Sequence, residues 1–175
     1  MNKRATFVLF SLVVVVVVAL TSGITAYLTD GDSADNNLSI GGNRVEIVEE
    51  FTPPEELLPG VVIPKNVMVT NVGPSDCYVR VMAVFSNGDM KQYCEVDWNT
   101  SNWVLNSTDG YWYYTKPIAT GESTPSLFTT ITIDDSAPAD AIVEFDMIVY
   151  AESYQSAGSN SYTEAWANYQ TNKPN

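Results

Sequence analysis

The chain has 175 residues, with 21 acidic, 8 basic and no histidine residues, and a formal net charge of −13. This length suits one domain with a sizeable core, and the negative charge repels phosphate backbones, so we expect no nucleic-acid partner. Without histidine there is no HExxH zinc site and no Ser-His-Asp triad, and neither a GxSxG motif nor a phosphate-binding glycine loop occurs. We therefore predict no catalytic, metal-binding or cofactor-binding residues.

The first 26 residues follow the pattern of a signal peptide. Two basic residues precede the apolar run Ala5–Leu20, and a short stretch of small residues ends at Ala26. We predict cleavage between Ala26 and Tyr27, signal peptidase as a partner during export, and a protein secreted to the extracellular matrix or cell surface. The alternative is a permanent anchor, because the apolar run extended to Leu28 is long enough to span a bilayer. The uncleaved segment is the only membrane contact that we expect.

Residues 27–43 are polar and rich in Asp, Asn, Ser and Gly, which predicts a flexible N-terminal arm. Within it, Asp30–Asp35 suggests a calcium loop. An EF-hand numbered from Asp30 needs an oxygen ligand, a glycine and a glutamate where this chain has Ala34, Asp35 and Gly41. A flexible acidic linker is therefore the expectation for this stretch.

Residues 44–175 consist of short β-branched and aromatic runs separated by turn residues, which predicts an all-β domain. Strands of this length and spacing are typical of a jelly-roll-like β-sandwich. The expected strands cover residues 45–51, 61–72, 77–85, 90–98, 103–105, 111–115, 127–133 and 141–152. Because Pro64 cannot donate to a ladder, the first half of the second run should be an edge or an irregular start.

The run Cys77–Phe85 places its odd-numbered residues on one face and Arg80 on the other, so the apolar face should be core. Asn87-Gly88 then predicts a type I′ hairpin that joins this run to residues 90–98. That hairpin would keep Cys77 and Cys94 roughly 13 Å apart along the strands, whereas a disulfide needs Cα atoms within about 7 Å. We favour free thiols, and a longer loop is the alternative that would let them pair.

A short C-terminal helix is also expected. Ser161 and Glu164 have the spacing of a capping box, and an apolar stripe with helical periodicity follows. The stripe consists of Tyr162, Ala165, Trp166 and Tyr169. It should pack the helix onto the sandwich.

An aromatic cluster lies in the run 111–115. Trp112 and Tyr114 share one strand face, and Tyr111 and Tyr113 share the other. One pair should belong to the core and the other to a contact surface, and we assign Trp112 and Tyr114 to an interface between subunits. The alternative use of such a platform is sugar stacking in a monomeric adhesin or glycan-binding module.

The first expected strand suggests a mode of assembly. Val45, Ile47 and Phe51 lie on one face of it, so the segment could insert as a donor strand into the sheet of a neighbouring copy. A head-to-tail contact of this kind does not close and gives a homopolymeric filament. Pairing within its own domain is the equally open alternative, because closing a short loop costs little.

Four segments, taken in order, resemble the TasA/camelysin group of secreted proteins of Gram-positive bacteria. They are Gly23–Asp30, Val69–Gly73 with Tyr78–Val81, Tyr113–Tyr114 with Lys116–Ile118 and Gly121–Thr124, and Glu152–Gln155 with Glu164–Trp166. The first is similar to the junction cleaved by the SipW-type signal peptidase. The others are similar to that group's TNxG…YVRV core, its Y-Y…GExT segment and its ExxQ…EAW ending.

This resemblance implies a jelly-roll domain that forms biofilm-matrix or surface filaments, in which an N-terminal strand of one subunit completes the sheet of the next. Camelysin-like members are also labelled metalloendopeptidases, which is the alternative function of the enzyme class. No zinc-binding motif in this sequence supports that alternative.

Overall fold

The structure is a computed structural model that describes residues 37–39 and 43–172. The predicted signal peptide, its cleavage site at Ala26 and Tyr27, the Asp30–Asp35 segment and most of the predicted arm lie outside the described residues. Within those residues, no helix combines the length and the apolar character needed to cross a membrane.

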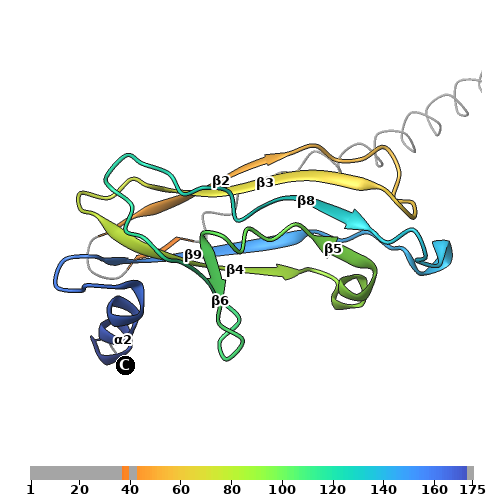
Figure 1. The fold of residues 1–175 in the computed structure, drawn as a ribbon. Coiled ribbons are helices and arrows are strands. Elements are labelled where there is room, and N and C mark those ends of the chain that lie inside the picture. Colours follow the sequence, from red (N-terminus) through yellow and green to blue (C-terminus); the bar gives the residue numbers. More distant parts are fainter. Residues whose placement is uncertain (1–36, 40–42, 173–175) are drawn as a thin grey trace, which may run out of the picture. The chain divides into compact units, whose positions relative to one another are not determined.

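The described residues form two β-sheets and one α-helix (Figure 1). The strands are β1 (Asn37–Ser39), β2 (Val45–Phe51), β3 (Val62–Asn71), β4 (Cys77–Phe85), β5 (Cys94–Val96), β6 (Trp103–Leu105), β7 (Trp112–Tyr114), β8 (Phe128–Ile133) and β9 (Met147–Gln155). The helices are the 3-10 helices η1 (Gly88–Tyr93) and η2 (Ala139–Ala141) and the α-helix α2 (Tyr162–Asn172).

The first sheet, sheet A, has the strand order β1-β9-β4-β7-β6, and the second, sheet B, has the order β2-β3-β8-β5. Neighbouring strands are antiparallel except β1 and β9, which are parallel. The expectation of an all-β sandwich with a short C-terminal helix is confirmed.

The core lies between the sheets and receives one face of each long strand. Val67 and Val69 of β3 and Val79 and Val81 of β4 are each 0% exposed and belong to one buried cluster. Burying a side chain of this size contributes about 1.5–3 kcal/mol. The alternation predicted for Cys77–Phe85 is confirmed, because its odd-numbered residues all contribute to this cluster.

Strand β3 is central in sheet B although it contains Pro64. Its register with β8 shifts between Pro64 and Val67, so the proline lies at a bulge. Residues 62–64 pair with β8 on one side only, because the ladder with β2 begins at Lys65, so both the predicted irregular start and the predicted edge position are confirmed for the first part of β3.

A buried asparagine fixes the turn after β3. The Asn71 side chain accepts a hydrogen bond from Gly73 N at 2.9 Å and donates to Ser75 O at 2.8 Å and Ile118 O at 3.0 Å. A Cβ atom at Gly73 would lie 2.7 Å from Arg44 N, so this close approach requires glycine.

The hairpin predicted at Asn87-Gly88 is wrong. A type I′ turn needs positive φ at both central residues, but Asn87 has φ −113° and caps η1 by accepting a hydrogen bond from Asp89 N at 3.0 Å. The helix η1 buries Met90 completely, and this burial outweighs the local turn preference. Cys77 and Cys94 consequently lie in different sheets, and both thiols are free, as expected.

The last predicted strand, 141–152, begins later than expected. Strand β9 starts at Met147, and Val143 lies before it with 44% of its surface exposed. Asp146 marks the start, because its carboxylate accepts a hydrogen bond from Met147 N at 2.7 Å while its own N–H donates to the Ser86 hydroxyl at 2.8 Å.

Candidate functional site

The first two strands of the described chain lie at sheet edges. Strand β1 pairs through three residues with β9 at one edge of sheet A, and β2 pairs through seven residues with β3 at one edge of sheet B. Residues Met147–Tyr150 of β9 have a strand neighbour on one side only, namely β4. Segment 37–51 therefore supplies an edge strand to each sheet, and no other pairing in the described residues depends on it.

The three predicted donor residues have different surroundings within β2. Val45 is 2% exposed and belongs to the main core, Ile47 is half-buried against it, and Phe51 is 49% exposed. In this single chain β2 pairs with β3 of its own domain, which is the alternative that the sequence left open. The arm predicted over 27–43 contains β1, and only residues 37–39 and 43 of it are described.

A buried lysine holds the far end of β2. The Lys65 ammonium group lies 2.8 Å from a Glu49 carboxylate oxygen and 3.4 Å from one of Asp146, and 5.1 Å from the centre of the Phe51 ring. Its side chain is 6% exposed, while those of Glu49 and Asp146 are 32% and 66% exposed. We call these four residues the Lys65 clasp. Two of its members come from β2.

The assignment of Trp112 and Tyr114 to a subunit interface is wrong. Both share a strand face, as predicted, but that face is the core, where they are 7% and 8% exposed. Trp112 stacks on Trp98 with ring centroids 4.7 Å apart. Neither ring is available to a partner or a sugar, because both strand faces of β7 are covered, one by sheet B and the other by α2.

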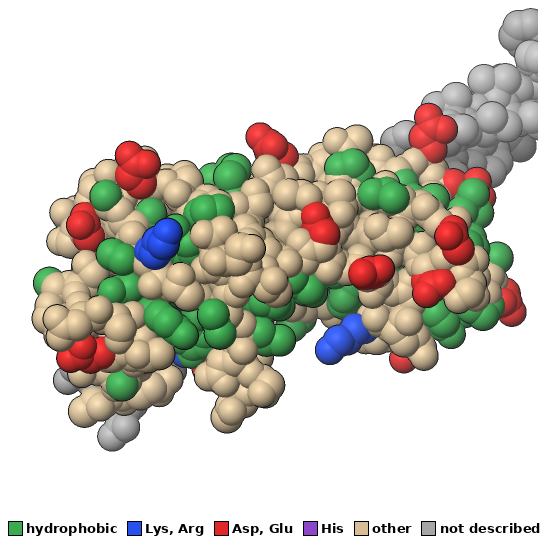
Figure 2. Space-filling model, in the orientation of Figure 1, with side chains coloured by type: hydrophobic (Ala, Val, Ile, Leu, Met, Phe, Trp, Pro, Cys, Tyr) green, Lys and Arg blue, Asp and Glu red, His purple; other side chains and the backbone are tan. Residues whose placement is uncertain are grey.

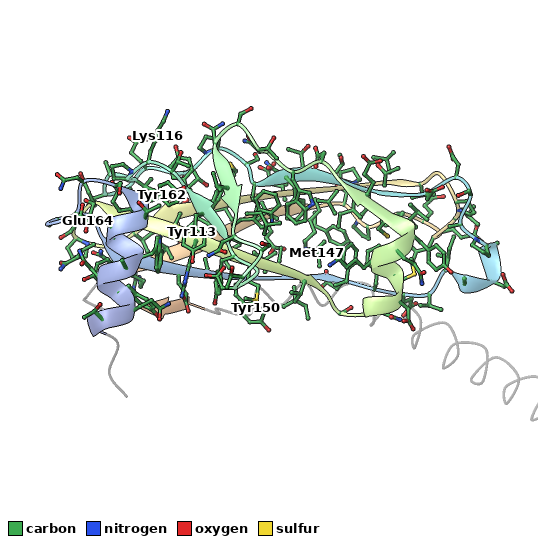
Figure 3. The ribbon with its side chains drawn as sticks, turned by 60° about the horizontal axis from the view of Figure 1, so that its bottom comes forward. Tyr113, Lys116, Met147, Tyr150, Tyr162 and Glu164 are labelled. Atoms are coloured by element: carbon green, nitrogen blue, oxygen red, sulfur yellow. The ribbon has the colours of Figure 1, made fainter. Side chains whose placement is uncertain are left out.

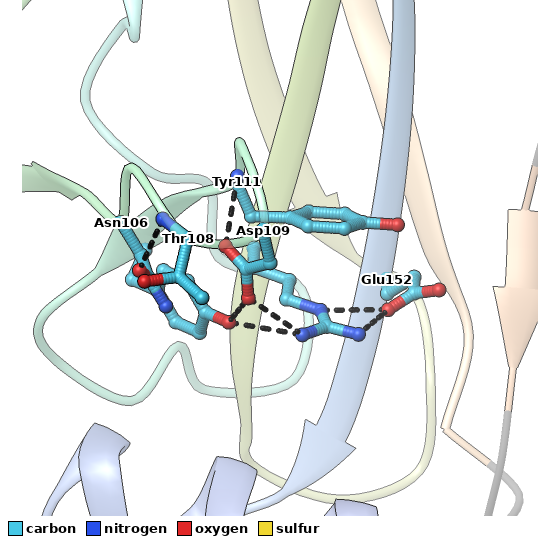
Figure 4. A network of polar contacts seen from close by, with 7 residues as sticks. Asn106, Thr108, Asp109, Tyr111 and Glu152 are labelled. Atoms are coloured by element: carbon cyan, nitrogen blue, oxygen red, sulfur yellow. Dashed lines mark hydrogen bonds and ion pairs between the residues drawn. The ribbon is translucent and has the colours of Figure 1, made fainter.

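The outer face of sheet A, under α2, contains the buried arginine Arg80, whose polar contacts with Asp109 and Glu152 are drawn as dashed lines in Figure 4. Arg80 donates from Nε to Glu152 at 2.7 Å and from Nη1 to the Tyr113 hydroxyl at 2.9 Å, and its Nη1 lies 3.6 Å from an Asp109 oxygen. Tyr113 in turn donates to Asp109 at 2.5 Å. The guanidinium group thus joins β4, β7, β9 and the loop between β6 and β7.

Aromatic rings enclose the same guanidinium group. Its central carbon lies 4.1 Å from the ring centre of Tyr111, 4.4 Å from that of Trp166 and 5.2 Å from that of Tyr169. Such cation–π contacts become stronger when water is excluded. We call Arg80, Glu152, Asp109 and these surrounding rings, with Tyr113, the Arg80 centre.

The helix α2 closes the Arg80 centre from outside. Ala165 and Trp166 are 0% and 4% exposed, and Ser161 accepts a hydrogen bond from Glu164 N at 3.2 Å, so the predicted stripe and cap are confirmed. In Figure 3 Tyr113, Tyr162 and Glu164 lie at the α2 end of sheet A, and Tyr150 lies away from it. Sequence reasoning missed Arg80 as the docking point, although an arginine on the second face of a core strand was the signal.

Burial also changes the acidity of groups in this region. It raises the pKa values of Tyr111, Tyr113 and Tyr169 above the usual value, with further contributions from the neighbouring carboxylates. On the core face of β4, burial and the adjacent Asp76 raise the pKa of Cys77 to about 12. A thiol with this pKa stays protonated and unreactive at neutral pH.

The described surface has a hollow beside β5 and no cluster of metal-ligating side chains. An open hollow of about 310 Å³ beside β5 is lined by residues that include Tyr93, Cys94, Asp134 and Asp135. Among the described residues, no three or more Cys, Asp or Glu side chains come together as a metal site would require. Figure 2 shows acidic side chains spread over the visible face, with few basic ones between them.

The fold and its buried centre define a class of protein: an all-β sandwich whose C-terminal helix is docked on one sheet by a buried arginine. Comparisons with protein-family models, curated proteins and solved structures found no match.

Proposed function

We propose that this protein is a secreted structural subunit that assembles with copies of itself into extracellular filaments of a biofilm matrix or cell surface. The observation that carries the proposal is the position of segment 37–51, whose two strands are edge strands of two different sheets. The pairings among the remaining strands of both sheets do not include any residue of this segment. A detachable segment of this kind suits strand exchange between copies.

The arrangement of the chain supports a jelly roll as the kind of sandwich. Consecutive strands repeatedly change sheets: β1 is followed by β2, β3 by β4, β4 by β5, β5 by β6, β7 by β8 and β8 by β9 in the opposite sheet. This alternation between layers is typical of jelly rolls. It also places the two strands of segment 37–51 in different layers, so an exchanged segment would join two sheets of its acceptor.

The segments that carry the resemblance to the TasA/camelysin group support the proposal in a second way. Arg80, Tyr113 and Glu152 come from three of these segments, and they meet in the Arg80 centre. Asn71 and Gly73, from the same set, form the buried turn after β3. The residues that carry the resemblance are thus parts of the framework of this fold.

In this proposal, cleavage during export determines when assembly can begin. Before cleavage between Ala26 and Tyr27, the apolar run tethers the N-terminal segment to the membrane, and after cleavage the segment is free to enter a neighbouring copy. The acidic surface opposes unspecific association of copies at low ionic strength, since like charges repel. Assembly then depends on strand pairing rather than on non-specific association.

The test compares the mature chain, beginning at Tyr27, with a chain that begins at Gly60 and lacks β1 and β2. We expect the mature chain to form filaments in negative-stain microscopy and to sediment. The shortened chain should remain unassembled and should bind an added peptide of residues 27–51. The matched control is the same peptide with Val45→Asp, which would bring a carboxylate into the core and should not bind. Filaments formed equally well by the shortened chain would rule out the segment as donor.

A further inference from the structure

The Lys65 clasp lies where an exchanged β2 would have to be recognised. Its ammonium group belongs to β3, which stays with the acceptor, while Glu49 and Phe51 belong to β2. Asp146 lies in the loop that precedes β9 of the other sheet and reaches the same ammonium group. The lysine therefore lies at the junction of the two sheets and the segment that could leave.

A lysine with a side chain 6% exposed needs a compensating partner. Strand β2 itself contacts this ammonium group through Glu49 and Phe51, and burying an ammonium group without a carboxylate is unfavourable, so a strand that lacks the carboxylate leaves Lys65 with Asp146 alone. An incoming strand restores the clasp only if it brings a carboxylate at position 49 and an aromatic ring at position 51.

The register of β2 depends on the same contacts. Phe51 is opposite Lys65, and Glu49 is opposite Val67, two residues further along β3. A slip of one residue turns the β2 side chains to the other face, and a slip of two moves either the ring or the carboxylate away from the ammonium group. At the other end of β2, Val45 is opposite Asn71 and lies in the core in the observed register.

We propose that Lys65 is the specificity-determining residue for β2: it selects a strand from a copy of this chain, in one register, by its contacts with Glu49 and Phe51. For a strand supplied by a neighbouring copy, this inference rests on the proposed function. For β2 of the same chain, the same contacts select the strand without any assembly. Where the strand comes from another chain, the recognised partner is a second copy of this protein rather than any extended apolar peptide.

A charge exchange tests the inference on mature chains. The single variants are Glu49→Lys and Lys65→Glu, and the double variant carries both in one chain. Each single variant places like charges where the ion pair was, and we expect the ratio of folded to unfolded chain to fall on the order of tenfold, with loss of filaments. The double variant should recover both properties. Glu50→Lys is the matched control, because this neighbouring carboxylate meets only Asn66 at the surface and should leave both properties unchanged.

Mixing the two single variants separates the inference from the proposed function. If β2 is exchanged, each variant supplies the charge that the other lacks, so an equimolar mixture should form filaments containing both chains in a 1:1 ratio. If the double variant recovers its stability but the mixture forms no filaments, Lys65 recognises β2 within one chain and exchange of β2 is ruled out. If the double variant is no more stable than the single variants, the inference is overturned whatever the wild-type chain forms.

A second set of variants covers the case in which Lys65→Glu does not fold. Lys65→Met and Glu49→Gln, alone and together, give the coupling between the two side chains from the unfolding midpoints in urea. The same double-mutant cycle with Glu50→Gln in place of Glu49→Gln gives the reference value of the coupling, for a carboxylate that does not contact Lys65. Coupling at Glu49 that is no larger than the reference overturns the inference.

Discussion

Two buried cations stabilise opposite parts of this sandwich, and they differ in where their partners come from. Arg80 is 4% exposed and lies on the outer face of sheet A under α2, with Glu152 beside it. Lys65 is 5% exposed and lies at the end of β2, with its carboxylate partners reaching toward solvent. The first is enclosed by strands in the middle of sheet A and by the C-terminal helix, and the second by an edge strand and a loop.

The chemistry of each cation matches its surroundings. The planar guanidinium group of Arg80 donates to two partners at once and stacks against rings, which suits a permanent centre. The ammonium group of Lys65 is a compact charge on a flexible stem and needs fewer fixed directions. The comparison indicates that the Arg80 centre is enclosed on all sides of its cation, whereas the carboxylates of the Lys65 clasp are open to solvent.

The largest effect should come from Arg80→Met. This variant keeps a long apolar stem but leaves the Glu152 side chain, which is 10% exposed, without its cation. We expect the free energy of unfolding to fall by about 3–5 kcal/mol, measured in urea, with a loss of the near-ultraviolet signal of the rings around Arg80. Lys116→Met removes an exposed cation and serves as the control, with a change within about 0.5 kcal/mol. A loss from Arg80→Met as small as that of the control would remove the distinction between the two cations.

High pH should weaken the Arg80 centre in particular. The pKa values of Tyr111, Tyr113 and Tyr169 are raised in the folded chain, so above pH 10 the unfolded chain loses these protons first and the free energy of unfolding falls as pH rises. A single group contributes about 1.4 kcal/mol per pH unit between its unfolded and folded pKa values.

The measurement compares unfolding at pH 8 and pH 10.5. It uses a Cys77→Val background, because the raised pKa of Cys77 acts in the same direction. Tyr113→Phe should reduce the fall with pH, while Lys65→Met should leave it unchanged, since no tyrosine belongs to the Lys65 clasp. If the free energy of unfolding falls equally with pH in the background chain, in Tyr113→Phe and in Lys65→Met, the Arg80 centre is not the source of the pH dependence.

The smallest effect should come from Lys65→Met. This variant leaves Glu49 and Asp146 able to take up water, because both are partly exposed, and the methionine fills the space of the lysine stem. We expect a loss of less than about 1 kcal/mol in the free energy of unfolding, as for a pair near the surface. A loss as large as that of Arg80→Met would show that the clasp is as permanent as the Arg80 centre.

The sequence alone predicted most elements of the sandwich and the packing of its helix, since these depend on period and local chemistry. Alternation placed Arg80 opposite the core face of β4, and the capping residues placed the start of α2. The hairpin at Asn87-Gly88 failed because a turn preference is local, whereas the burial of Met90 depends on the second sheet.

Sequence patterns were less informative about the aromatic residues of β7 and about Lys65. Alternation separates Trp112 and Tyr114 from Tyr111 and Tyr113. It cannot show that both faces of the strand are covered, one by the core and the other by α2. The contact of Lys65 with Asp146 joins residues 81 positions apart. It depends on how the strands on either side of the sandwich come together, for which a single sequence has no periodic signal.

The parallel pairing of β1 with β9 has a mechanical consequence. When the two ends of this domain are pulled apart, β1 is pulled backward along its axis and β9 forward, so the load acts in shear on all three paired residues together. Strand β2 is loaded differently, because Val45 and its partner Asn71 lie at the end where force would enter, and the ladder with β3 would open one pair after another. In a fibre under tension, the short strand β1 would therefore protect the longer one behind it from peeling.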